Sequence, residues 1–575
     1  MISVRQHLFL IVCFSAVILF TNLGGPKLWD RDEPRNAGCA AEMLQRGDWV
    51  TPYFNDELRT HKPVLLYWFI MSAYAVFGVN EFSARFWSAA LAVGTALCTY
   101  QLGRCLFNAR VGLWAAIILS STLMFDVAGR AATPDSVLVF FTTAAVTVYA
   151  TGTFRYGKME QLFPTQYRYV VAMYALMGLA VLAKGPVGLV LPTAVIGMLM
   201  LIRRLPERPF PPTTPVWKKR FFSCLRPFAP WHFLKTCWAM RPVTAILVAA
   251  TIAVPWYAWV GYRTDGEFLR VFFWEHNLSR ATSPMEGHDG GIAFYPIAIL
   301  CGFFPWSVFA GPVLLGLIAR VRRRDPWSPG YTLAACWVGV YVVAFTLAQT
   351  KLPSYVTPCY PGLALLTGAF IYHWIEGTQL VSPLWTRAAF VVCAAIGAVL
   401  LLALPFALAR FLPGEQWLAA IGLIPLLGGI AAIVVSESGK RRMAARVFAT
   451  AALLFTTSMF AVVAQRVSSH QRYQELVDAI RGHSDAPRIA ALGALEPTWV
   501  FYAGQPVYEF DRSTAVSFLN ESTDHFLITR ADQYESLRDE LPPDARVLTS
   551  VNYFLKDEKL IVLGRQEPRM ASRPN

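Results

Sequence analysis

Long apolar runs separated by short polar segments make up most of this chain. Runs of roughly 18 to 25 mostly uncharged residues are long enough to cross a hydrocarbon core of about 30 Å as helices. About thirteen such runs are expected, at residues 8–24, 81–103, 111–128, 136–154, 169–184, 186–202, 243–262, 292–318, 330–348, 355–376, 386–408, 416–436 and 443–465, and the stretch 64–78 is ambiguous. With 55% hydrophobic and 15% charged residues, the chain is predicted to be a polytopic all-α membrane protein.

The first apolar run follows Arg5 and can be read as a secretory signal peptide. No small-x-small cleavage site clearly follows it and many further spans come after, so an uncleaved first helix is favoured. Lysine and arginine concentrate in cytoplasmic loops, and with the N-terminus inside, every strongly basic loop falls on the inner side. Much of the net charge of +14 is therefore a topology signal, which argues against nucleic-acid binding.

After about residue 466 the composition changes to an ordinary polar mix. The segments "RIAALG", "TWVFYAG", "PVYEF", "HFLITR", "ARVLTSV" and "KLIVLGR" read as short strands, and "QYESLRDEL" reads as a helix. We therefore expect a membrane domain at 1–465, whose first outer loop spans 25–80, and a small α/β domain at 466–575. An odd number of spans would place this second domain outside as well.

Charged and polar residues gather at the outward ends of the predicted spans. The first outer loop holds "WDRDEPR" with Asp32, Glu33 and Arg35, and then "THKP" with His61 and Lys62. The later outer junctions hold "GRAATPDS" with Asp135, "AKGPVG" with Lys184, "FFWEHNLSR" with His276 and Arg280, and "QTKLPSY" with Lys351 and Tyr355. A lone lysine at a helix end is usually interfacial, but polar groups at all five junctions indicate a reaction at one membrane face.

The distribution of charge also separates an enzyme from a transporter. A transporter is expected to bury ionisable groups near the bilayer midplane, whereas the central parts of these spans carry almost none. Cations can stabilise a phosphate that departs from a glycosyl group, and a carboxylate can orient or deprotonate an acceptor. The residues that suit the first role are Lys62, Lys184, Arg280 and Lys351, and Asp32 suits the second.

At these same positions the chain resembles a known family. The segment "RDEPRNAGCAAEMLQRGDWVTPYFNDELRTHKPVLLYW" resembles the first outer loop of the bacterial 4-amino-4-deoxy-L-arabinose lipid A transferases and of the wider protein O-mannosyltransferase-like group. The match continues in order through "FGVNEFSAR", "TPDS", "AKGPVG", "VPWY", "FFWEHNLSR", "FFPW" and "TKLPSY". The resemblance implies a GT-C membrane glycosyltransferase of the bacterial inner membrane that takes an undecaprenyl-phosphate-linked sugar on the periplasmic side.

Residue roles follow from the resemblance position by position. Asp32 matches the essential acid of the first loop and Asp135 the second acidic position. Lys62 and Tyr355 fall where the family contacts the donor phosphate, and Arg280 is a looser match because the spacing after the histidine varies. We expect Arg35 to hold Glu33 or Asp30 in place.

One departure from the family pattern bears on whether this site can bind a metal ion. His276 matches a histidine that binds a metal together with an acid just before "KP", but that acid is replaced here by His61. The two histidines can bind Zn²⁺ if Glu275 or Asp289 completes the shell, and they can equally be neutral hydrogen-bonded side chains. The implied reaction itself requires no cofactor and no nucleotide.

Several readings remain open at this point. Transfer of aminoarabinose to a lipid A phosphate leads, and transfer of another sugar to a protein or a different glycan is the alternative within the family. A polyprenyl-lipid transporter or flippase would keep its function after Asp32→Asn. A third reading makes the C-terminal domain a partner-binding module on an inactive scaffold.

Overall fold

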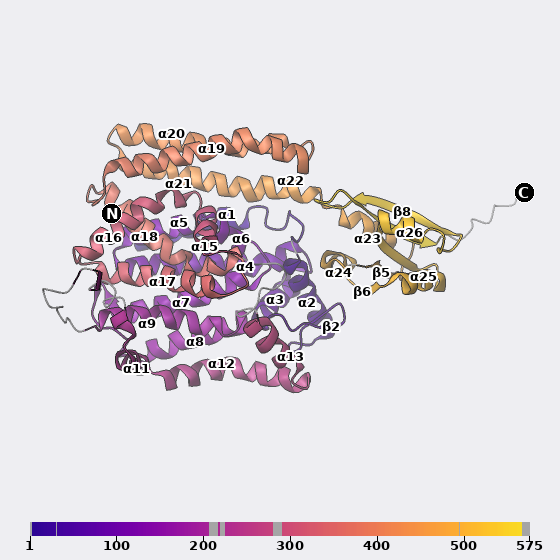
Figure 1. The fold of residues 1–575 in the computed structure, drawn as a ribbon, viewed down its shortest axis with the longest axis horizontal. Helices are drawn as coiled ribbons and strands as arrows, with labels where there is room; N and C mark the ends of the chain where they lie inside the picture. The colour runs from indigo at the N-terminus through magenta and orange to yellow at the C-terminus, as the bar shows by residue number, and fades with distance from the viewer. Residues whose placement is uncertain are drawn as a thin grey trace, which may run out of the picture.

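The computed structural model describes residues 3–29, 31–205, 215, 217–218, 225–279, 290–493 and 495–565. Most of the chain is helical, and the long helices lie side by side along one direction in Figure 1. The helices before the C-terminal unit are α1 Val4–Phe20, α2 Asp32–Arg46, α3 Leu65–Phe77, α4 Glu81–Leu106, α5 Ala109–Leu119, α6 Leu123–Gly129, α7 Pro134–Thr153, α8 Tyr167–Lys184, α9 Val187–Arg203, α11 Pro230–Ala239, α12 Pro242–Arg263, α13 Glu267–Arg270, α15 Phe294–Gly302, α16 Ala310–Arg322, α17 Ser328–Leu347, α18 Tyr360–Ile375, α19 Pro383–Phe411, α20 Leu423–Glu437, α21 Arg441–Ser458 and α22 Ala464–Ser469.

Short 3₁₀ and π segments connect several of these helices. They are η1 Arg226–Phe228, η2 Val271–Ser279, η3 Trp306–Phe309, η4 Pro353–Cys359, η5 Gln416–Gly422 and η6 Met459–Val463. Two small antiparallel hairpins, β1 Tyr53–Phe54 with β2 Glu57–Leu58 and β3 Phe154–Arg155 with β4 Lys158–Met159, lie in the loops. Of these segments, η2 and η4 carry predicted site residues.

A polytopic membrane protein is what the helix lengths indicate. Among the described residues, seven helices are long and apolar enough to cross a membrane, or nine if each of two bent pairs is one span. The runs predicted as single spans at 111–128 and 292–318 are these bent pairs, α5 with α6 at 72° and α15 with η3 and α16 at 118°. Ser121 and Thr122 return their hydroxyls to backbone carbonyls at the first bend, and Pro305 lies at the second, where it cannot donate a backbone N–H.

The C-terminal unit is a five-stranded sheet with helices on both faces. Its strands are β5 Arg488–Leu492, β6 Val507–Phe510, β7 His525–Arg530, β8 Ala545–Asn552 and β9 Lys559–Arg565, in the order β6-β5-β7-β9-β8. The first three strands are parallel neighbours, and β9 pairs antiparallel with β7 and β8. Alternate residues of β5 enter two separate cores, one against α23 Tyr473–Arg481 and α24 Pro497–Ala503, the other against α25 Arg512–Glu521 and α26 Ala531–Leu537.

Five of the six predicted strands are present, but "TWVFYAG" is the helix α24. Pro497 occupies its first turn and Gly504 ends it in the left-handed region, with φ of 67°. These are the usual start and stop of a helix, and they outweigh the β-branched and aromatic residues between them.

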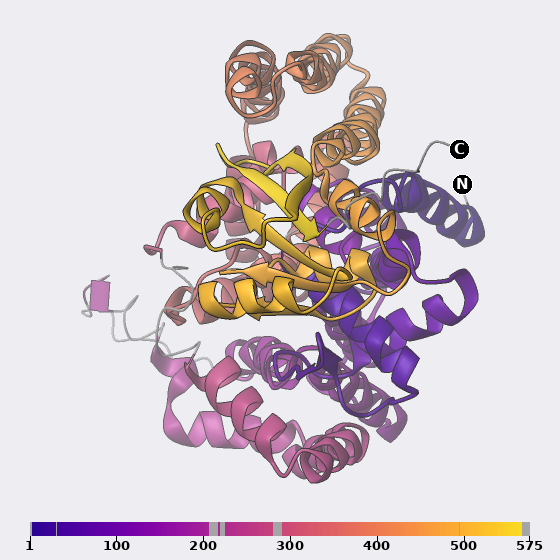
Figure 2. The same cartoon turned by 90° about the vertical axis from the view of Figure 1, so that its right-hand side faces the viewer.

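The C-terminal unit covers one end of the helical bundle. Figure 1 shows it beyond α22, next to α2 and α3, and Figure 2 shows it in front of the helix ends when the molecule is viewed from that side. The last long helical stretch runs from Arg441 to Ser469, and α23 begins at Tyr473. The sheet therefore lies at the end of the bundle that carries the first predicted outer loop.

Candidate functional site

Asp32 is the first residue of helix α2 and lies beside several cations. With Glu33 it forms an acidic first turn, a place where the helix dipole favours negative charge. Its side chain reaches solvent yet is surrounded by enough protein that desolvation acts to raise the pKa of its carboxyl; the opposing charges win and hold that pKa below its usual value. The cations responsible are Lys62, Arg59, Arg35 and Lys184. Asp32 is therefore an ionised carboxylate at neutral pH.

Glu33 is buried and holds three segments together. Its carboxylate accepts hydrogen bonds from Nε and Nη2 of Arg85, at 2.8 and 2.7 Å, from the backbone N–H of Trp29 at 2.7 Å and from that of Ala132 at 2.8 Å. The described ion pair of Glu33 is made by Arg85 of α4, whereas the sequence suggested Arg35 as the partner of Glu33 or Asp30. Asp30, the other acid named for Arg35, lies outside the described residues.

Arg59 is a buried cation that the sequence motifs did not single out. Its Nε donates to the hydroxyl of Tyr67 and its Nη2 to Oδ1 of Asn36, each at 3.1 Å. The amide of Asn36 in turn donates to the carbonyl of Ala132 at 3.0 Å. Arg59 is thus fixed close enough to Asp32 for its charge to lower the pKa of that carboxyl.

An open cavity of about 830 Å³ brings six of the predicted junction residues together. They are His61 and Lys62 from the first loop, Asp135 from α7, Lys184 from α8, His276 from η2 and Tyr355 from η4. Its complete lining is His61, Lys62, Pro63, Asp135, Leu138, Lys184, Val187, Phe272, His276, Asn277, Phe345, Ala348, Thr350, Ser354, Tyr355 and Pro358. The cavity thus has cations and hydroxyls beside apolar side chains, a lining suited to an amphiphilic molecule with an anionic head.

Asp135 and Lys184 form an ion pair at the wall of this cavity. Asp135 is in the first turn of α7 and Lys184 is the last residue of α8, each at the helix end that suits its charge. Their side chains are only 15% and 16% exposed, and the Lys184 ammonium lies 5.1 Å from the centre of the Tyr355 ring. The pair and the ring therefore fix one positive charge toward the cavity.

Lys351, predicted to contact the donor phosphate, is directed elsewhere. Its ammonium donates to the carbonyls of Thr346 and Ala348 at 2.9 and 3.0 Å, and the residue is 6% exposed. These carbonyls belong to the end of α17, where helical carbonyls lack internal partners. The neighbouring Thr350 lines the cavity, whereas Lys351 does not.

His61 and His276 stack on each other at the cavity. Their ring centres are 4.1 Å apart, and Oγ1 of Thr60 is 3.4 Å from Nε2 of His276. Desolvation, then the nearby Arg59, lowers the pKa of His61 to about 3, so this imidazole is neutral at physiological pH. Nδ1 of His61 is buried and has no hydrogen-bond partner in the described part of the chain.

The described residues do not complete a zinc site around these two imidazoles. No group of three or more His, Cys, Asp or Glu side chains with metal-binding geometry occurs among them, and Glu275 is exposed. Asp289 and Arg280, predicted from the sequence as a metal ligand and a phosphate contact, lie outside the described residues. A structural zinc ion usually has four protein ligands, so two imidazoles alone do not fit it.

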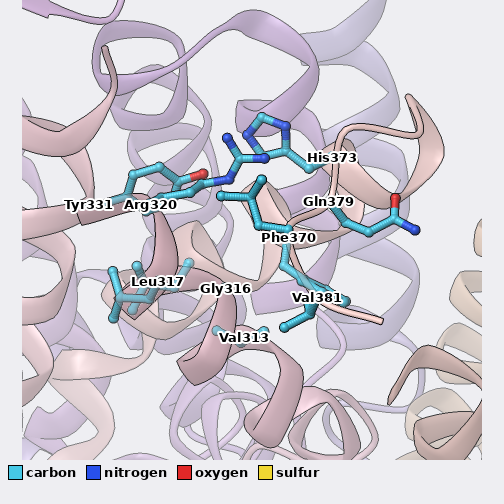
Figure 3. A pocket seen from close by; sticks show the side chains of 11 residues that line it. Val313, Gly316, Leu317, Arg320, Tyr331, Phe370, His373, Gln379 and Val381 are labelled. Carbon is cyan, nitrogen blue, oxygen red and sulfur yellow. The ribbon is translucent and has the colours of Figure 1, made fainter. Parts of the chain in front are cut away.

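Two further features lie away from this cavity. A smaller cavity, lined by Arg320 and His373, lies at the far end of α18 (Figure 3). The Arg320 guanidinium is already engaged, since it donates to Asp325 and to the carbonyl of Thr378, both at 2.6 Å. In the bent pair of α5 and α6, Asp126 is fully buried, and its carboxylate has no hydrogen-bond partner among the described residues. The hydrophobic pattern of the sequence did not reveal this intramembrane acid.

Comparison with known proteins supports the interpretation of the motifs. Residues 61–231 match the family of dolichyl-phosphate-mannose-protein mannosyltransferases. An uncharacterised protein of Aquifex aeolicus is 29% identical over 365 residues, 63% of this chain and 64% of that protein. An undecaprenyl phosphate-alpha-4-amino-4-deoxy-L-arabinose arabinosyl transferase of Yersinia pestis is 26% identical over 480 residues, 81% of this chain and 78% of that enzyme.

Among solved structures, the fold is that of ArnT from Cupriavidus metallidurans. The crystal structure of that protein bound to undecaprenyl phosphate superposes with a TM-score of 0.77 at 21% identity, over 98% of both chains. The apo structure of the same protein gives a TM-score of 0.76. The fold and the family match at 61–231 make this chain similar to GT-C membrane glycosyltransferases. The resemblance to the aminoarabinose transferases that the sequence motifs indicated is confirmed.

Proposed function

We propose that this chain transfers a sugar from an undecaprenyl-phosphate donor to an acceptor at the outer face of the bacterial inner membrane. The observation that carries the proposal is the cavity in which Lys62, Asp135, Lys184 and Tyr355, from four separate outer junctions, meet. Cations among apolar walls suit the phosphate and the first isoprene units of such a donor. The similarity to the Yersinia pestis arabinosyl transferase favours aminoarabinose as the sugar and a lipid A phosphate as the acceptor.

The chemistry is a direct displacement at the anomeric carbon. The acceptor oxygen forms a bond to this carbon while the bond to the donor phosphate breaks, and inversion follows. Undecaprenyl phosphate leaves with its charge stabilised by the ammonium groups of Lys62 and Lys184. Asp135 keeps Lys184 extended toward the cavity, and Tyr355 supports the same ammonium through its ring face.

Asp32 is better suited to orient an acceptor than to deprotonate one. Four cations lower the pKa of its carboxyl, and a carboxylate with a lowered pKa is a weak base. A hydroxyl acceptor would need a proton removed, whereas a phosphate acceptor is already anionic. The charge state of Asp32 thus supports a phosphate acceptor, held through a cation that Asp32 fixes.

We further propose how the chain is oriented in the membrane. With the N-terminus inside and about thirteen spans, counting each bent pair as one, the site and the C-terminal unit would lie on the periplasmic side. We place the membrane domain at 1–465 and the α/β domain at 466–575. His61 and His276 are proposed as the contact positions for a metal if one is bound, and no step of the reaction is routed through it.

The direct test is transfer by purified protein in lipid nanodiscs. Undecaprenyl-phosphate aminoarabinose with lipid A, and undecaprenyl-phosphate hexoses with protein or glycan acceptors, would be supplied in parallel. The proposal expects release of undecaprenyl phosphate and a matching mass gain on lipid A, both lost in Asp32→Asn. Release only with a hexose donor and a protein acceptor would instead support the mannosyltransferase-like reading, which the family match at 61–231 favours.

Transport of a polyprenyl lipid is the second candidate, and Asp126 is the observation in its favour. An unpartnered intramembrane acid in a bent span is a frequent feature of transport pathways. Asp126→Asn should leave sugar transfer intact if the chain is a transferase. Loss of lipid movement across proteoliposomes in Asp126→Asn, together with no transfer by the wild type, would support transport.

A further inference from the structure

A short connector, Pro26 to Trp29, lies shortly before helix α2, which begins at Asp32. On one side the connector is held by the buried pair of Glu33 and Arg85. The guanidinium of Arg85 donates to the carbonyls of Pro26 and Lys27 at 2.7 and 2.9 Å, and the backbone N–H of Trp29 donates to Glu33. Because α2 begins at Asp32, any shift of this connector moves the catalytic carboxylate.

The other side of the connector is held by the end of the chain. The hydroxyl of Tyr502, in α24, accepts a hydrogen bond from the backbone N–H of Leu28 at 3.1 Å and donates to Oε1 of Glu81 at 2.9 Å. Glu81 is the first residue of α4, the helix that carries Arg85. One phenol therefore joins the connector to the same helix that anchors it from the opposite side.

Further contacts of the connector come from the junction with the C-terminal unit. The Lys27 ammonium donates to the carbonyl of Gln471 at 2.6 Å, and its backbone N–H donates to Ser468 at 2.8 Å. The rings of Trp29 and Phe554 meet edge to face, with centres 5.5 Å apart. Lys27, Leu28 and Trp29 thus each have a partner from the C-terminal part of the chain.

A second attachment lies at the β1–β2 hairpin of the first loop. The side-chain amide of Asn55 donates to the carbonyl of Val507 at 2.9 Å and its oxygen accepts from the Val507 N–H at 2.8 Å, so it pairs with β6 as a strand residue would. Phe54 packs against the core of the C-terminal unit, and Phe501 of that unit packs against the core that contains α2 and α3. The two cores interlock at this point.

From these contacts we infer that the C-terminal unit is part of the active-site framework, with Tyr502 as a positioning residue that fixes the connector before Asp32. This inference rests on the proposed sugar transfer. It differs from the reading of the unit as a separate partner-binding module, because its contacts converge on the segment that carries the catalytic acid. Tyr502 acts through Leu28 and Glu81, neither of which lines the cavity.

The test uses the full-length protein and three single variants. Tyr502→Phe removes the bridging hydroxyl and keeps the ring. Asn55→Gly removes the second attachment without backbone strain, because Asn55 has a φ of 59° that glycine adopts freely. Tyr508→Phe is the matched control, since Tyr508 is 45% exposed on β6 and its hydroxyl has no hydrogen bond within the described part of the chain.

Two measurements separate positioning from general stability. Hydrogen exchange of the peptide that covers residues 26–46 should rise in Tyr502→Phe and in Asn55→Gly and stay unchanged in Tyr508→Phe. Turnover in Tyr502→Phe should fall about fivefold, the worth of one ordinary hydrogen bond, while the donor KM stays within about twofold. The KM is expected to be spared because the hydrogen bonds of Tyr502 go to Leu28 and Glu81, which do not line the cavity that holds Lys62 and Lys184.

Unchanged exchange in both variants would overturn the inference, and so would faster exchange with wild-type turnover. A rise in donor KM equal to the fall in turnover would also overturn it, since this would show general loosening of the cavity. If the wild type releases no undecaprenyl phosphate from any donor, the proposed function fails, and the exchange data alone then decide whether the C-terminal unit fixes the connector. If Tyr502→Phe does not fold, Asn55→Gly carries the test.

Discussion

Replacing Glu33 by glutamine should destabilise the protein far more than a similar change on the same helix. Glu33 is 4% exposed, as is Arg85, and the carboxylate accepts four hydrogen bonds. Glutamine keeps the shape, but its NH₂ group would face one of those four donors and the Arg85 guanidinium would lose its counter-charge. Breaking a buried ion pair from one side costs about 3–5 kcal/mol, so a loss of about 3 kcal/mol is expected.

The matched control for this change is Glu42→Gln. Glu42 lies on the same helix and pairs with Arg46, whose side chain is 35% exposed, so its loss should cost no more than about 0.5 kcal/mol. Unfolding of both variants by SDS in mixed micelles, followed by tryptophan fluorescence, gives the two free energies of unfolding relative to wild type. A difference between the variants below about 0.5 kcal/mol would refute the reasoning, because the buried pair would then not be what holds the first loop.

The remaining predictions concern the cavity. Lys62→Ala should raise the donor KM about ten- to a hundredfold, because one charge-assisted phosphate contact is lost. Lys351→Ala should instead lower thermal stability and leave the donor KM within about twofold. Equal effects of the two variants on the donor KM would contradict the assignment. The free energy of unfolding should fall as the pH is lowered from 6.5 toward 4, because the unfolded chain binds a proton at His61 that the folded chain, with its pKa of about 3, does not bind. His61→Gln should flatten that dependence, and an unaltered slope would refute it. EDTA should leave turnover unchanged, and a loss that Zn²⁺ restores would reveal a complete metal shell around His276.

The membrane architecture was largely readable from the hydrophobic pattern, because each predicted run corresponds to a helix or to a bent pair. The bends themselves were not visible in the sequence, because Ser121 and Thr122 are uncharged and do not interrupt an apolar run. Their hydroxyls nevertheless bond to backbone carbonyls of the preceding turn, which favours a bend there. The convergence of the junction residues on one cavity was also predictable. Helix ends on one side of a membrane lie close together, so polar groups at those ends meet.

What the sequence could not provide is the partner of each buried charge. Glu33 pairs with Arg85, 52 positions away, although Arg35 is nearer along the chain. Side chains two apart on a helix point in different directions, whereas Arg85 of α4 meets the Glu33 carboxylate directly. The sequence predicts a phosphate contact for Lys351, because charge alone does not reveal that its ammonium reaches the carbonyls of Thr346 and Ala348 at the end of α17.

Arg59 and the C-terminal contacts were missed for a related reason. Arg59 stands in "DELRTHKP", where its neighbours Lys62 and His61 carry the more familiar motif, and only its burial against Tyr67 and Asn36 reveals its place. The role inferred for Tyr502 depends on contacts across more than 400 positions of the chain. No local pattern encodes such a distance.

The proposed reaction and the place of Asp32 in it are best tested together, by the release of undecaprenyl phosphate from undecaprenyl-phosphate aminoarabinose by wild-type protein and by Asp32→Asn, with lipid A present. Asparagine keeps the size and removes the charge that the surrounding cations stabilise. We predict release by the wild type and a loss of about a hundredfold or more in turnover by the variant, with its folding and donor binding retained. Equal release by both proteins would contradict the assignment of Asp32, and release by neither would contradict the proposed reaction.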